Sequence, residues 1–395
     1  MQFEFARSAR SSVGVEWELG LVDSATLELT PAAGPLLADL GAGEATPVRK
    51  EYLQSMVELV SGAHTRVGDA IADLADSLAR TRAAADGLGV ALLGSGCHPF
   101  SSAEAQKPFT GERYDRVKER TRYWGRQMAI CGTHIHVGVT HRDQALPVTN
   151  GLARFYPFFL ALSASSPFWE GVDSGYASQR TMLFQQLPTN GLPYRMTAWS
   201  EFEAYADELA ECGMITVPGE IRWDVRPSPK FGTVENRTPD SVPTLGELGA
   251  LAALTQCLAE YIVTDLEGPR EVEDLPPWLV KENKWRAARY GLDAEVITPD
   301  HGKRVQPLRD YLYEWLERLI PVSRRLGCAD ELAFCEQLAI RGASYERQVA
   351  RAAAAGGDLR EVVSLLLVET GAASPFVPLP GPGRDDRARP TPAGG

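Results

Sequence analysis

Acidic and imidazole side chains stand in closely spaced pairs at two places in the first 140 residues. Glu16 and Glu18 alternate with apolar residues in one short segment, and His134 and His136 do so in another. Side chains two residues apart point to one face of a strand. A carboxylate pair suits Mg²⁺ or Mn²⁺, and a histidine pair can ligate a metal ion. Taken alone, the acidic pair is more typical of a solvent-facing strand. The histidine pair fits a metal site and an exposed strand face without a function equally well.

Two further glutamates flank a second apolar segment. Glu58 lies within MVELV, and Glu51 precedes it by seven residues. In one continuous strand this spacing would put the two carboxylates on opposite faces. A shared site therefore requires a bend near Gln54–Ser55.

Carboxylates and guanidinium groups alternate between residues 221 and 237. Asp224 and Arg226 are predicted to share one strand face with Arg222, and Glu235 and Arg237 share another. Such an arrangement can hold a metal ion and neutralise phosphate oxygens. The alternative is a structural ladder of ion pairs between adjacent strands, which does not explain the surrounding Trp-Asp and Arg-Pro-Ser-Pro context.

These residues must be positioned by few strands and many helices. Alternation predicts strands at 13–22, 56–60, 90–93, 130–140 and, around a Pro-broken turn, 221–237. Helical spacing predicts helices at 65–86, 152–164, 244–266, 277–290, 307–326, 330–355 and 358–370. Capping-box patterns also predict helix starts at Ser200, with Glu203, and at Thr244, with Glu247. Because strands and helices do not alternate regularly, the fold class is α+β.

Composition limits the partners of the protein. The chain has 395 residues and a formal net charge of −12, which argues against nucleic-acid and anionic-membrane partners. No apolar run is long enough to cross a membrane.

The six cysteines form no CxxC pair and are typical of reduced, mostly buried thiols, so a cytoplasmic protein is expected. No P-loop, GxGxxG or GxSxG motif is present.

The chain is expected to form one catalytic domain over residues 1–377. Its strand-rich core spans about 10–240, and its mainly helical part spans 244–370. Residues 378–395 are rich in Pro and Gly and lack an apolar face, so a disordered tail is predicted.

Six blocks occur in the order and spacing of one known family and cover roughly residues 10–370. The chain resembles the type-2 glutamate–cysteine ligases, also called carboxylate–amine ligases. The blocks are GVEWEL (14–19), KEYLQSMVELVSG (50–62), GTHIHVGV (132–139), SASSPFWEGVDSGYASQR (163–180), WDVRPSPKFGTVENRTPD (223–240) and ENKWRAARYGLDA (282–294).

This resemblance implies a glutamine-synthetase-like fold, in which an antiparallel sheet forms a funnel with helices packed outside. The implied reaction is ATP-dependent. ATP phosphorylates a substrate carboxylate, and an amine attacks the acyl phosphate to give an amide, ADP and phosphate. The family name points to L-glutamate as donor and to cysteine or another amine as acceptor. A homodimer is also implied.

The resemblance assigns roles by motif. Arg226 and Arg237 would stabilise the transferred phosphoryl group, Arg180 would bind a substrate carboxylate, and His136 would line the same face. The implied ligands of Mg²⁺, or of Mn²⁺, are Glu16, Glu18, Glu51, Glu58, His134 and Glu235.

Two other interpretations remain open from the residues. The first is a metal-dependent hydrolase built on the HxH pair, in which Zn²⁺ activates water. It needs further ligands, and after this pair only His141 and His301 remain. The second is a nucleotide-binding relative without activity. The presence of every acidic residue of the matched motifs argues against it.

Overall fold

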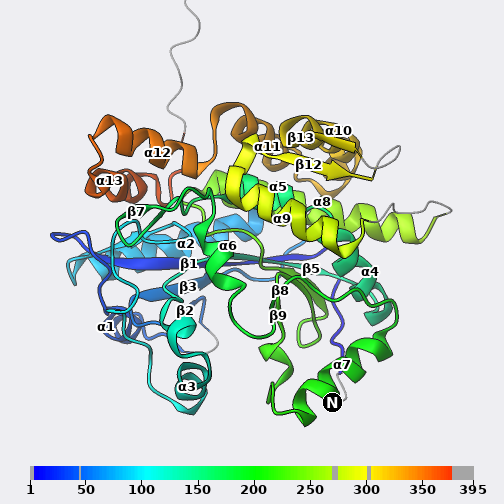
Figure 1. Ribbon diagram of the computed structural model, residues 1–395, viewed down its shortest axis with the longest axis horizontal. Helices are drawn as coiled ribbons and strands as arrows, with labels where there is room; N and C mark the ends of the chain where they lie inside the picture. Colours follow the sequence, from blue (N-terminus) through cyan, green and yellow to red (C-terminus); the bar gives the residue numbers. More distant parts are fainter. Residues whose placement is uncertain (1–3, 44–45, 269–274, 300–303, 376–395) are drawn as a thin grey trace, which may run out of the picture.

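The computed structural model describes residues 4–43, 46–268, 275–299 and 304–375. The predicted tail at 378–395 and the candidate ligand His301 lie outside the described residues. Within the described ranges, strands and helices are segregated, which confirms the α+β class (Figure 1).

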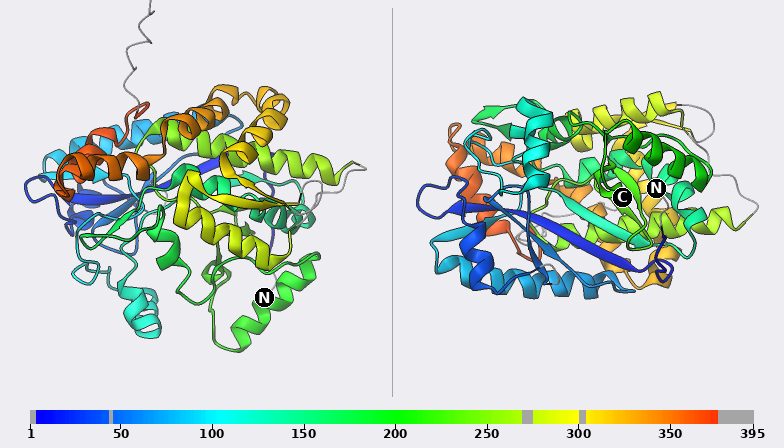
Figure 2. Two further views of the ribbon diagram at one scale, coloured as in Figure 1. Left: turned by 45° about the horizontal axis from the view of Figure 1, so that its top comes forward. Right: turned by 90° about the horizontal axis from the view of Figure 1, so that it is seen from below.

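A seven-stranded antiparallel sheet forms the centre of the molecule. Its strand order is β10-β11-β5-β1-β3-β2, and β4 pairs with the second half of β1. The long β1 crosses the molecule in the view from below in Figure 2. The strands are β1 (Val13–Asp23), β2 (Val48–Lys50), β3 (Met56–Val60), β4 (Val90–Leu93), β5 (Thr133–Gly138), β10 (Val225–Ser228) and β11 (Thr233–Asn236).

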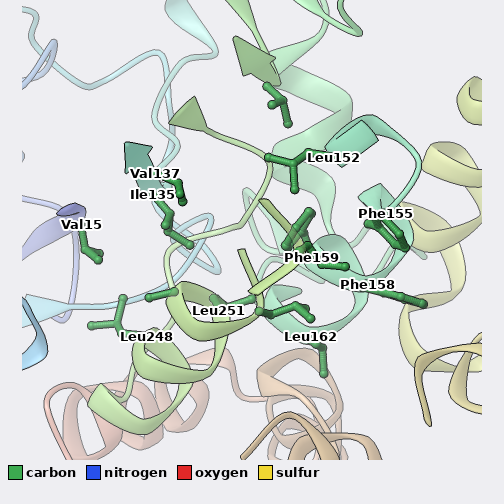
Figure 3. Packing of buried hydrophobic residues seen from close by; sticks show 14 of the residues in the cluster. Val15, Ile135, Val137, Leu152, Phe155, Phe158, Phe159, Leu162, Leu248 and Leu251 are labelled. Carbon is green, nitrogen blue, oxygen red and sulfur yellow. The ribbon is translucent and has the colours of Figure 1, made fainter. Parts of the chain in front are cut away.

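Helices cover one face of this sheet. Figure 1 places α8 and α9 on the opposite side of the sheet from α3 and α7. Val15 and Ile135 on the sheet belong to one buried cluster with Leu251 of α8 and Phe159 of α5 (Figure 3). The helices that pack on the sheet include α2 (Val67–Asp86), α4 (Arg142–Ala153) and α8 (Leu245–Leu266), and α5 (Tyr156–Ser163) packs against α8.

An outer helical layer follows α8. The capping box at Thr244 is present, and it starts α8 as predicted. The outer helices are α9 (Pro277–Tyr290), α10 (Leu308–Leu326), α11 (Ala329–Arg341), α12 (Ser344–Ala354) and α13 (Leu359–Glu369). Smaller elements complete the fold: α1 (Ala33–Asp39), α3 (Glu112–Arg126), α6 (Gln179–Phe184), α7 (Trp199–Glu211), η1 (Pro218–Glu220), η2 (Gly291–Asp293), β6 (Phe168–Trp169), β7 (Val172–Asp173), β8 (Asn190–Gly191) and β9 (Arg222–Trp223).

Three predictions about elements are wrong in detail. The single helix 330–355 is two helices, because Gly342 adopts φ +101° between them. The helix 152–164 is the end of α4 and a separate α5. Helix α7 starts at Trp199, with Glu201 rather than Glu203 completing the cap. The helical region also contains an unpredicted hairpin, formed by β12 (Glu295–Thr298) and β13 (Arg304–Pro307).

Candidate active site

The sheet face opposite the helices lines a cavity of about 330 Å³. The cavity walls also include the segment after β2, the segment between α3 and β5, and helix α6. Eight residues are predicted to bind the metal ion or the phosphoryl group, and seven of them line this cavity: Glu16, Glu18, Glu51, Glu58, His134, Arg226 and Arg237. Arg180, which is predicted to bind a substrate carboxylate, lines it as well. The eighth, Glu235, pairs with two of these arginines.

The alternation of β1 separates its charged and apolar side chains. Glu16 and Glu18 point into the cavity, whereas Trp17 is fully buried on the other side and donates its indole N–H to the carbonyl of Val242. The register of the sheet places His134 beside Glu16, and Glu58 beside Glu18. Cross-strand pairing therefore brings together ligands that are distant in the sequence.

Glu51 joins this group through a tight turn. The chain turns at Gln54–Ser55, between β2 and β3, where the sequence requires a bend. Carboxylate oxygens of Glu18, Glu51 and Glu58 lie within 4.8 Å of one another. Burial, with the negative charge of Glu51, raises the pKa of Glu18 to about 8. Burial and the neighbouring carboxylates also raise the pKa of Glu58 well above its usual range.

The two histidines lie among the carboxylates. His134 Nδ1 is 3.2 Å from Glu16 Oε2, and His136 Nε2 is 3.6 Å from Glu16 Oε1. Burial, helped by Arg237, lowers the pKa of His134 to about 4. Burial also opposes charge on Glu16, but its hydrogen bonds with His134 and His136 outweigh burial and hold the pKa of Glu16 well below its usual range.

Two arginines flank Glu235. Arg226 Nε lies 2.8 Å from Glu235 Oε2, and Arg237 pairs with the other carboxylate oxygen. Although burial opposes it, the two guanidinium charges lower the pKa of Glu235. The ladder of ion pairs that is the alternative to a metal–phosphate site is therefore present, and its two arginines line the cavity. Arg237 Nε is buried without a hydrogen-bond partner among the described residues, so it can donate to an anion.

Arg180 is presented by α6. Its guanidinium donates to the carbonyls of Thr238 and Arg237 over 3.3 and 3.4 Å, and its buried Nε has no hydrogen-bond partner within the described ranges. Asp240 lies 4.0 Å away and accepts from the hydroxyl of Ser178, the N-cap of α6. This network fixes the start of the helix that carries Arg180.

One sequence expectation about this region is wrong. Asp224 does not share the cavity face with Arg226, because its carboxylate pairs with Lys284 of α9 at 2.6 Å. The backbone bends at Asp224 between β9 and β10. Its carbonyl still accepts from the backbone N–H of Arg237, so the residue supports the site from behind.

Several cavity residues were not predicted. Lys50 and Asn190 add polar groups beside Arg222, which the sequence places in the same charged segment, and an apolar wall faces them. Phe184 follows Arg180 by four residues, a helical spacing that could have placed it on the same side of α6, whereas Leu187 lies beyond the end of that helix. The wall, called the apolar wall below, is formed by Tyr52, Met56, Met128, Ile130, Phe184 and Leu187.

The model of glutamate–cysteine ligase family 2 matches residues 12–364. The chain belongs to this family. Glutamate–cysteine ligase family 2 chains are ATP-dependent enzymes that form carbon–nitrogen bonds. A relative from Leifsonia xyli subsp. xyli, named provisionally as a glutamate–cysteine ligase 2, is 49% identical over 93% of this chain and 98% of its own length. A relative from Arthrobacter sp. is 48% identical over 92% and 97%.

Solved structures agree on the fold of this family 2 chain. The glutamate–cysteine ligase of Francisella tularensis, crystallised with AMP, gives a TM-score of 0.66 at 14% identity over 92% of this chain and 90% of its own. A bifunctional glutathione synthetase from Pasteurella multocida gives 0.64 at 13% identity, over 91% of this chain and 52% of its own. In the described residues, no helix is both long and apolar enough to cross a membrane.

Proposed function

We propose that the protein joins the side-chain carboxylate of L-glutamate to an amine, with cysteine as one candidate acceptor, at the expense of ATP. The observation that carries this proposal is the meeting of carboxylates, imidazole and unpartnered guanidinium donors on one sheet face. Phosphoryl transfer depends mainly on positioning and charge neutralisation, which such a face supplies.

The donor set fits a divalent cation. Buried carboxylates with raised pKa values repel one another, and a bound cation relieves that repulsion. The residues proposed to hold Mg²⁺, or Mn²⁺, are Glu16, Glu18, Glu51, Glu58, His134 and Glu235. Bound there, the ion would offset the charge of the nucleotide phosphates.

The arginines are proposed to act on the anions of the reaction. Arg180 orients the carboxylic acid, while Arg226 and Arg237 balance the charge on the transferred phosphoryl group. A carboxylate oxygen of glutamate attacks the γ-phosphorus and ADP leaves. The amine nitrogen then attacks the acyl carbon, phosphate leaves, and the nitrogen loses a proton. We place the side chain of the amine against the apolar wall, because the donor and ATP are both strongly polar.

A hydroxylamine trap tests this function. Purified protein receives ATP, Mg²⁺, hydroxylamine and one carboxylic acid at a time, starting with L-glutamate. Hydroxylamine replaces the unknown amine, so the assay reports the acyl phosphate alone. Formation of glutamyl hydroxamate with ADP release supports the proposal. Signal with a different acid would change the donor, and silence with every acid would favour a nucleotide-binding relative without activity.

Metal content separates the ligase from the hydrolase built on the HxH pair. The ligase predicts a requirement for added Mg²⁺ or Mn²⁺, whereas stoichiometric, tightly bound Zn²⁺ would favour the hydrolase.

A cytoplasmic location is proposed because both ATP and glutamate are available there. The homodimer implied by resemblance stays a prediction, which light scattering tests.

A further inference from the structure

A second, smaller cavity, of about 50 Å³, lies beside the first. Its walls come from α3, from the segment before β8 and from the chain that runs from the end of α7 to β9, and none of its described lining residues belongs to the central sheet. Leu187 and Arg222 line both cavities, so the two meet at these residues. The volume holds a few groups of the size of a water molecule, which is enough for a carboxylate.

Three arginines line this cavity, which is called the arginine pocket below: Arg116 and Arg120 of α3, and Arg222 of β9. Arg116 and Arg120 are four residues apart, so they lie on one side of the helix. Among the described residues that line the pocket, Glu220 has the only carboxylate. It accepts from the N–H of Thr216 over 2.6 Å and from the hydroxyl of the same residue over 3.2 Å. The pocket therefore carries an excess of positive charge in a chain whose formal net charge is −12.

Two of these arginines tie the walls of the pocket together. Arg116 Nη1 donates to Thr216 Oγ1 over 2.9 Å, and Arg120 donates to the carbonyl of Met214. These bonds join α3 to the segment that follows α7, and they fix where the guanidinium groups lie. A guanidinium has five N–H donors in a planar fork, which matches the two oxygens of a carboxylate. A carboxylate in the pocket can therefore be bound by groups that are already in place.

An apolar path leads from the carboxylate–histidine cluster to this pocket. Arg180, which is proposed to bind the acid, lies one turn before Phe184 on α6, a rise of about 6 Å along the helix. Its guanidinium carbon is 5.5 Å from the centre of the Phe184 ring. Leu187 comes next in the apolar wall, and it is the residue of that wall that also lines the arginine pocket. A ligand that follows this wall away from the cluster ends at the arginines.

We propose that the arginine pocket binds a carboxylate of the amine acceptor, and that the preferred acceptor is an ω-amino acid with an apolar chain. The inference rests on the proposed function, in which the amine attacks the acyl phosphate at the cluster. An α-amino acid such as cysteine has its carboxylate on the carbon next to the nitrogen, so it cannot reach the pocket while it reacts. An ω-amino acid has its amine and its carboxylate at opposite ends of an apolar chain. This order matches that of the cluster, the apolar wall and the arginines.

Binding of two ligands that differ only at the carboxylate tests the pocket without turnover. Calorimetry compares ω-aminooctanoate with octylamine, in which a methyl group replaces the carboxylate. The wild-type protein should bind ω-aminooctanoate about tenfold more tightly, because charge-assisted hydrogen bonds add to its affinity. Arg120→Gln should lose this preference. Arg126→Gln is the matched control and should keep it, because Arg126 is an exposed arginine of the same helix and lies outside both cavities.

The same comparison in the complete reaction tests the role of the ligand as acceptor. The protein receives ATP, Mg²⁺, the carboxylic acid that gives hydroxamate and one amine at a time, and the amide is detected by mass spectrometry. The kcat/KM for ω-aminooctanoate should be about tenfold higher than that for octylamine. β-Alanine, whose chain is too short to span the apolar wall, should react more slowly than ω-aminooctanoate.

Three results would overturn the inference: equal binding of ω-aminooctanoate and octylamine by the wild-type protein, a preference that Arg120→Gln and Arg126→Gln change equally, or faster amide formation with cysteine or β-alanine than with ω-aminooctanoate. The proposed function fails separately. Hydroxamate formation without any preference between the two ligands keeps the ligase and removes the pocket. Arg120-dependent binding without hydroxamate formation keeps the pocket as a carboxylate site and removes the ligase.

Discussion

Single residues on the sheet face show where charge is balanced and where it is not. Glu235 is paired on both oxygens by arginines, and its pKa is lowered. Glu18 and Glu58 lie beside further carboxylates, and their pKa values are raised by burial and by that repulsion. The unbalanced carboxylates are where a cation relieves the most repulsion, and Glu235, also proposed as a metal ligand, holds the two arginines in place as well.

Glu16→Gln should lower the rate of ATP turnover about 100-fold or more, because it removes a charge from the carboxylate–histidine cluster that lines the cavity. The side chain keeps its size, so the fold should persist by circular dichroism. Glu28→Gln, at an exposed glutamate, is the matched control. Hydroxamate formation is the measurement, and a near-normal rate in Glu16→Gln would contradict the site.

His98 should make stability depend on pH. Its Nδ1 accepts from the N–H groups of Phe100 and Ser101, and its Nε2 lies 2.9 Å from the carbonyl of Leu27, so the neutral ring fits and the charged ring does not. Burial lowers its pKa from the usual 6.5 to about 4. Below pH 6.5 the unfolded chain binds a proton that the folded chain refuses. About 3 kcal/mol of stability is therefore present above pH 6.5 and is lost as pH falls to about 4.

Urea unfolding at pH 7 and pH 5 measures this effect. His98→Asn should be less stable than wild type at pH 7, and the difference between the two proteins should shrink at pH 5. A difference that stays constant with pH would show that His98 does not titrate in this way.

At the scale of elements, α6 is placed against the sheet by small residues and a buried carboxylate. Asp240 accepts from Ser166 and Ser178 over 2.7 and 2.8 Å, which fixes the start of the helix. Gly132, just before β5, leaves room for Arg180, since a Cβ there would overlap its guanidinium. The position of Arg180 therefore depends on how a helix and a strand meet.

Gly132→Ala should raise the KM for the carboxylic acid about tenfold or more, because the added methyl group displaces Arg180. The hydroxylamine assay measures this KM. Gly34→Ala is the control: Gly34 lies in α1 with open space around it, and alanine favours a helix. Equal KM values in the two variants would show that Arg180 does not bind the acid.

At the scale of the whole molecule, the two faces of the central sheet have different roles. One face is apolar and covered by helices, which supplies the core, and the other carries charged groups. The cavity opens on the charged face, beside the carboxylate–histidine cluster. The apolar face therefore stabilises the fold that holds the carboxylates close together despite their repulsion.

Divalent cation should raise the melting temperature of the whole protein. Binding to the folded state alone adds about 2.7 kcal/mol at a hundredfold excess over Kd. Scanning calorimetry with Mg²⁺ and with chelator measures the rise. Glu58→Gln should lose most of it, and Glu28→Gln should retain it. An equal rise in both variants would place the bound ion elsewhere.

The sequence by itself determined the main strands, most helices and the candidate residues. Alternation and helical spacing are local, so β1, β3 and the start of α8 at Thr244 were predictable. The ordered motif blocks also predicted the family and fold class. Breaks such as that at Gly342 were missed because they depend on a single backbone angle.

Only the tertiary structure decided which residues meet. Cross-strand register brings Glu58 to Glu18, and the ion pair with Lys284 takes Asp224 away from the cavity. The apolar wall and the cavity that it lines are assembled from segments far apart in the chain. Their composition depends on long-range packing, which the spacing of residues along one strand or helix does not encode.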